Sequence, residues 1–117
     1  MELVAFVGRD IENWGQITGL IKRMAWEKVV LVKQEGSDDF PEYSNVKSIT
    51  ISDKKPLVHL KAELMEKLKP LLADFEVALS LASGNGKEHM ALVAALLSLP
   101  VGIRLVAYTK DGVEFIT

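Results

Sequence analysis

Residues 77–97, VALSLASGNGKEHMALVAALL, predict a strand, a glycine-containing turn and a helix in direct succession. Val77–Leu81 is a short apolar run typical of a buried strand, and it stops at Ser83-Gly84-Asn85-Gly86-Lys87. The helix that follows is apolar almost all round from Met90 to Leu99, and Pro100 closes it. A buried strand joined by a short turn to an apolar helix is the building unit of a parallel α/β sheet.

The rest of the chain repeats this alternation of strands and helices. Leu3–Val7 (LVAFV) predicts a strand that is buried on both faces and lies centrally in the sheet. Asn13 and Gln16 have the spacing of a capping box, which predicts a first helix from Asn13 to Ala25. Further strands are expected at Lys28–Val32, Val46–Ile51, Gly102–Tyr108 and Val113–Ile116, and a helix is expected from Leu57 until Pro70 ends or kinks it.

This order predicts the α/β class. The expected architecture is a Rossmann-like three-layer sandwich with a mostly parallel six-stranded sheet, and the turn Lys110-Asp111-Gly112 gives it a C-terminal antiparallel β-hairpin. The 117 residues are enough for one domain of ordinary size, so a single domain over residues 1–117 is expected. With 49% hydrophobic and 26% charged residues, the chain has ample material for a core.

Charge and residue usage exclude several classes of function. The 14 basic and 16 acidic residues give a net charge of −2, which provides no global field for duplex DNA or an anionic membrane. Any anion site must therefore be local. The chain has no cysteine and only two histidines, so no metal site and no cofactor are predicted. Without a signal peptide or an apolar run of about 20 residues, the chain is expected to be cytoplasmic, with no membrane segment.

Ligands of open α/β sheets bind beyond the carboxyl ends of the strands, where the winding direction reverses. Two loops qualify, Gly8–Asn13 after the first strand and Ser83–Lys87 after the fourth, and they should be neighbours across that reversal. The two loops together therefore predict one crevice.

The second loop carries the sharper signal. Gly84 and Gly86 allow close approach of the backbone, and Asn85 and Glu88 have capping-box spacing for the next helix. Free N–H groups at that helix start, together with Lys87, would form a local anion site. The simpler interpretation is that the glycines only make a sharp turn and that Lys87 is solvated. The spacings of a P-loop and of G-x-G-x-x-G are both absent, which argues against nucleoside triphosphates and dinucleotides.

In the first loop, the planar guanidinium of Arg9 is suited to phosphate, although Asp10 and Glu12 beside it would partly neutralise it. His89 lies in the first turn of the third helix, where it either contacts a ligand or is a half-exposed surface residue. The predicted ligand-binding residues are Gly8, Arg9, Asp10, Ser83, Gly84, Asn85, Gly86, Lys87 and His89.

The third helix has no polar face to present to water over Met90–Leu97. One side can face the sheet, and the other is most simply buried by a second copy across a two-fold axis, which predicts a homodimer. The alternative is intramolecular cover by the first helix or the chain end.

Three stretches carry a resemblance to a known family: WEKVVLV at 26–32, VAYTKDGVEFI at 106–116 and Ser83-Gly84-Asn85-Gly86-Lys87. Together they resemble the CRISPR-associated Rossmann-fold family, the CARF domains. WEKVVLV at 26–32 is similar to that family's second strand, and VAYTKDGVEFI at 106–116 is similar to its closing hairpin. Ser83-Gly84-Asn85-Gly86-Lys87 stands where the family has T-G-G-T-K-x-M before an alanine- and leucine-rich helix. The sequence departs from that motif at Asn85 and Gly86, and its methionine, Met90, is displaced by one position.

The resemblance implies a homodimer that binds a cyclic oligoadenylate, a second messenger of antiviral signalling, in a pocket across the two-fold axis. A sensor or regulatory domain is the leading hypothesis. The first alternative is a metal-independent ring nuclease, in which a ribose 2′-hydroxyl attacks the adjacent phosphate. Lys87, Arg9, Ser83 and His89 are the groups available to assist it. The second alternative is a dimerisation module without a ligand.

Overall fold

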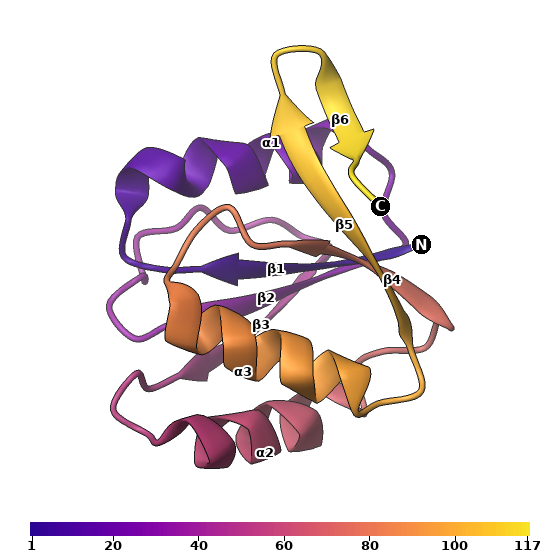
Figure 1. The fold of residues 1–117 in the computed structure, drawn as a ribbon. Helices are drawn as coiled ribbons and strands as arrows, with labels where there is room; N and C mark the ends of the chain where they lie inside the picture. Colours follow the sequence, from indigo (N-terminus) through magenta and orange to yellow (C-terminus); the bar gives the residue numbers. More distant parts are fainter.

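Six strands form one sheet, and the computed structural model describes all residues from 1 to 117 (Figure 1). The strands are β1 (Glu2–Val7), β2 (Lys28–Gln34), β3 (Val46–Ile51), β4 (Glu76–Ser80), β5 (Gly102–Thr109) and β6 (Gly112–Phe115). Their order across the sheet is β3-β2-β1-β4-β5-β6. Strands β1 to β5 are parallel and β6 is antiparallel to β5, which confirms the predicted mostly parallel sheet with its terminal hairpin.

Helices cover both faces of this sheet, as the alternating pattern predicts. They are the short 3₁₀ helix η1 (Ile11–Asn13), α1 (Trp14–Arg23), α2 (Leu57–Leu68) and α3 (Gly86–Leu97). Figure 1 shows α1 on one side of the strands and both α2 and α3 on the other. The result is a three-layer, Rossmann-like sandwich. None of its helices is both long and apolar enough to cross a membrane.

Strand β1 is central because its side chains are suited to burial on both faces. All six of its residues are buried, and it pairs with β2 on one side and β4 on the other. Even Glu2 is buried, and its carboxylate accepts hydrogen bonds from the backbone N–H groups of Ala73 and Asp74. Lys28 Nζ lies 3.7 Å from the same carboxylate, so the buried charge has a cationic neighbour.

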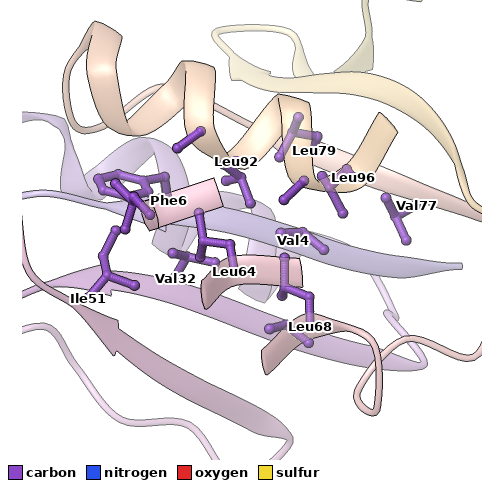
Figure 2. Close-up of a cluster of buried hydrophobic side chains, with 14 residues drawn as sticks. Val4, Phe6, Val32, Ile51, Leu64, Leu68, Val77, Leu79, Leu92 and Leu96 are labelled. Atoms are coloured by element: carbon purple, nitrogen blue, oxygen red, sulfur yellow. The ribbon is translucent and has the colours of Figure 1, made fainter. Parts of the chain in front are cut away.

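The core is divided by the sheet into two apolar clusters. Figure 2 shows the cluster beneath α2 and α3, where Phe6 and Val4 of β1 meet Leu64, Leu92 and neighbouring side chains of the helices. Alternate β1 residues point to the other face because successive side chains of a strand alternate.

Trp14 and Trp26 belong to the second cluster, under α1. Each indole N–H is satisfied internally, donating to the carbonyl of Gly8 and of Leu20 respectively. Neither indole is therefore a surface platform for stacking.

Both predicted capping boxes are wrong. Helix α1 begins at Trp14 after η1, and the Asn13 side chain donates to the Asp10 carboxylate instead of capping the helix. Asn85 makes no side-chain cap hydrogen bond, and Glu88 is buried with Oε2 unpaired instead of reaching back. In both cases the side chain that was expected to cap the helix makes no hydrogen bond to the free N–H groups at the start of that helix.

Helix α3 is covered on two sides but not on the third. It packs on the sheet and against α2, while α1 lies on the opposite face, so the alternative of cover by the first helix is wrong. We call Met90, Val93, Ala94 and Leu97 the exposed α3 face. Met90 is 60% exposed and Leu97 is 70% exposed, which leaves an apolar strip facing outward.

Candidate functional site

The loops that follow β1 and β4 meet at the carboxyl end of the sheet. The chain passes from β1 to β2 on one side of β1 and later returns to place β4 on the other, so the winding reverses between β1 and β4. Gly8 N donates to Ser83 Oγ at 2.9 Å, and a Cβ at Gly8 would lie 2.8 Å from Gly84 Cα. The two loops lie side by side, as the sequence predicts.

Asp10 joins these loops through its carboxylate. Oδ1 accepts from Ser83 Oγ at 2.6 Å and from Gly84 N at 3.0 Å, and Oδ2 accepts from Asn13 Nδ2 at 2.7 Å. Partial burial opposes ionisation, but the hydrogen bonds from Ser83, Asn13 and Gly84 outweigh it and lower the pKa of Asp10. Asp10 therefore uses the Ser83 hydroxyl and the Gly84 N–H itself, and neither is free for a ligand.

The predicted cations, Arg9 and Lys87, are both anchored on one residue that the sequence reasoning missed. Arg9 Nε donates to the carbonyl of Glu35 at 2.8 Å, and its Nη2 lies 3.4 Å from Asp53 Oδ2. Lys87 Nζ donates to the backbone carbonyl of Asp53 at 2.6 Å. The amide of Gln34 also donates to Asp53 Oδ2, at 2.9 Å.

A small polar crevice of about 290 Å³ lies between these groups. Gln34 is the last residue of β2, and Asp53 follows β3. Both residues therefore lie at the carboxyl ends of parallel strands, and these two strands are on the same side of the winding reversal as β1. Polar residues directly after those two strands were the signal that could have found them. The crevice is lined by Arg9, Asp10, Gln34, Asp53, Gly84 and Asn85.

The other predicted residues surround this crevice. Gly8 packs against Gly84 at the floor of the crevice, and Ser83 is buried beneath the crevice. Gly86 is the first residue of α3, and a Cβ at this position would meet no atom of another part of the chain. The amino end of α3 adjoins the crevice through Asn85, the residue before the helix, and the first N–H groups of a helix carry partial positive charge.

His89 lies where the crevice loop meets the exposed α3 face. Its Nε2 is 2.6 Å from the carbonyl oxygen of Ser83, and its ring packs edge-on against Phe6 with centroids 5.6 Å apart. A carbonyl oxygen only accepts, so Nε2 carries the proton and Nδ1 of the neutral ring holds a lone pair. His89 also borders the strip formed by Met90, Val93 and Leu97.

The charges of the crevice suit a ligand that bears both anionic and hydroxyl groups. Arg9 can meet a phosphate, while Asp53 and the amides of Gln34 and Asn85 can meet hydroxyl or base edges. No group of three or more His, Asp or Glu side chains is placed to hold a metal ion.

Fold and crevice together define a Rossmann-like α/β protein with a polar site at the point where the winding reverses. No protein-family model matches the chain, and no curated protein matches it. The resemblance to CARF domains stays a prediction.

Proposed function

We propose that the chain is a regulatory domain that binds a cyclic oligoadenylate as a homodimer. The observation that carries the proposal is the crevice between the β1 and β4 loops, which no hydrophobic residue lines, with half-exposed Arg9 on one side and the start of α3 on the other. A guanidinium and a helix amino terminus are both well suited to bind a phosphate group.

The size of the crevice favours a ligand shared between two copies. A volume near 290 Å³ is at the lower end of small-molecule sites and holds a single guanidinium. Two crevices around one ring would double the cationic groups that meet its phosphates, and multiplicity of this kind raises affinity strongly.

The exposed α3 face supplies a surface for such pairing. Its apolar side chains lie next to His89, whose ring is bonded to the crevice loop, so a two-fold contact there would bring two crevices near one axis. Interfaces between identical chains are more apolar than ordinary surface.

The enzyme alternative is favoured by one observation at His89. Because Nε2 donates to the Ser83 carbonyl, Nδ1 of the neutral ring is available to accept a proton from a ribose 2′-hydroxyl. Linear products formed from cyclic tetra-adenylate in EDTA, and lost in His89→Ala, would support the ring nuclease. A ring that binds and stays intact would support the sensor.

Calorimetric titration with cyclic tetra-adenylate, cyclic hexa-adenylate and AMP tests the proposal. We expect a ring to bind and AMP to bind at least about tenfold more weakly, since AMP cannot engage two crevices. Arg9→Ala and Lys87→Ala should each weaken ring binding roughly tenfold, because a charge-assisted hydrogen bond contributes about 1.5–3 kcal/mol.

Lys22→Ala is the matched control, since Lys22 is an exposed cation in the last turn of α1. Equal affinity for AMP and the rings, or unchanged affinity in both Arg9→Ala and Lys87→Ala, would contradict the proposal. Absence of any ring binding would favour the ligand-free dimerisation module.

A further inference from the structure

Three separate elements place a donor group on Asp53. Arg9 comes from the β1 loop, Gln34 from the end of β2 and Lys87 from the first turn of α3. The carboxylate meets the guanidinium and the amide, whereas Lys87 meets only the backbone carbonyl of Asp53. Replacing the carboxylate would therefore change the environment of Arg9 and leave the partner of Lys87 in place.

The carboxylate of Asp53 occupies the side of Arg9 that faces the crevice. Both side chains line it, and the Arg9 Nη2 to Asp53 Oδ2 distance is 3.4 Å. Nε is committed to the Glu35 carbonyl, whereas no partner is seen for Nη1. A phosphate that enters the crevice to meet the guanidinium at Nη2 must compete with Asp53.

The ion pair between Arg9 and Asp53 is weak enough for a phosphate to displace the carboxylate. Arg9 is 54% exposed and Asp53 is 30% exposed, and ion pairs in contact with water are weak. Asp53 lies in the loop between β3 and α2, outside the elements that hold Asp10 and Ser83 together. Movement of Asp53 away from Arg9 would leave the hydrogen bond between Ser83 and Asp10 intact.

We infer that Asp53 is an internal counter-anion, which stands in for phosphate on Arg9 and determines which anionic ligands can bind. The inference rests on the proposed phosphate-binding role of the crevice. Only a ligand whose phosphate outcompetes a carboxylate, or whose hydroxyls also donate to Asp53, binds well. Simple anions are thereby bound more weakly.

Calorimetric titration of the full chain with inorganic pyrophosphate and with cyclic tetra-adenylate at low ionic strength tests the inference. Asp53→Asn removes the charge and keeps an oxygen that can accept from Gln34. We expect this variant to bind pyrophosphate about five- to tenfold more tightly than the unsubstituted chain. The gain should vanish in the double variant Arg9→Ala with Asp53→Asn, because the two side chains act on each other.

Asp38→Asn is the matched control. It makes the same change of charge at an exposed loop position outside the crevice, and its pyrophosphate affinity should stay within about twofold. Unchanged or weaker pyrophosphate binding in Asp53→Asn overturns the inference, and so does failure of every variant to bind it. Tighter pyrophosphate binding without any ring binding overturns only the proposed function.

Discussion

At the scale of single residues, Gly84 is a position of the crevice that tolerates little change. Its φ is +98°, and a side chain there would collide with the ring of Phe6. Gly84→Ala should lower the free energy of unfolding by about 1–3 kcal/mol, since backbone strain and overpacking act together. The midpoint of urea unfolding measures this loss.

Gly86→Ala is the control for that experiment. Gly86 opens α3, and no atom lies within 4 Å of the position its Cβ would take. Alanine is a better helix former than glycine, so stability should stay equal or rise by up to about 1 kcal/mol. Equal losses in both variants would show that the collision with Phe6 is not the cause.

Asp10 should make stability depend on pH. Its folded-state pKa lies below the ordinary value of 3.8, so the stabilisation is complete above that value and is lost as pH falls through the lower, folded value. Asp10→Asn should therefore be less stable than the unsubstituted chain at pH 6, and the gap should narrow near pH 3. Urea unfolding at both pH values gives the comparison. A gap that widens on acidification would contradict the role assigned to this carboxylate.

At the scale of elements, the exposed α3 face is predicted to control self-association. Met90→Lys places a charge on a side chain that is 60% exposed, so folding should be retained while a two-fold contact through this face is lost. Light scattering should give a dimer mass for the unsubstituted chain and a monomer mass for Met90→Lys.

Val58→Lys on α2 provides the comparison for this test. Val58 is 72% exposed but lies outside the exposed α3 face, so the substitution should leave the mass unchanged. A monomeric unsubstituted chain at high micromolar concentration would rule out the predicted pairing.

The helices and strands could be predicted from the sequence better than the residues at which they begin and end. The apolar runs at β1 and β4 are long enough to identify strands, and Pro70 ends α2 close to Leu68 as expected. The caps at Asn13 and Asn85 were not predictable, because short polar side chains choose among several nearby partners that tertiary structure provides.

At the scale of the whole molecule, the order of the strands decides which residues of the crevice could be predicted from the sequence. Arg9 and Gly84 lie in the loops directly after the two central strands, and the reversal rule brings those loops together. Asp53 comes from the loop after the edge strand β3, and only the finished crossover from β3 to α2 carries it to Arg9. The position of Asp53 after a strand could have placed it at this end of the sheet, but its contact with Arg9, 44 residues away, has no local signature in the sequence.

The link that Asp10 makes between the β1 and β4 loops has a consequence for the kinetics of the ligand binding proposed above. Since Ser83 and Gly84 are already held by that carboxylate, the floor of the crevice is organised before any ligand arrives. Association would then lose little conformational entropy at the floor, and its rate would depend on diffusion and on the departure of Asp53 rather than on loop ordering.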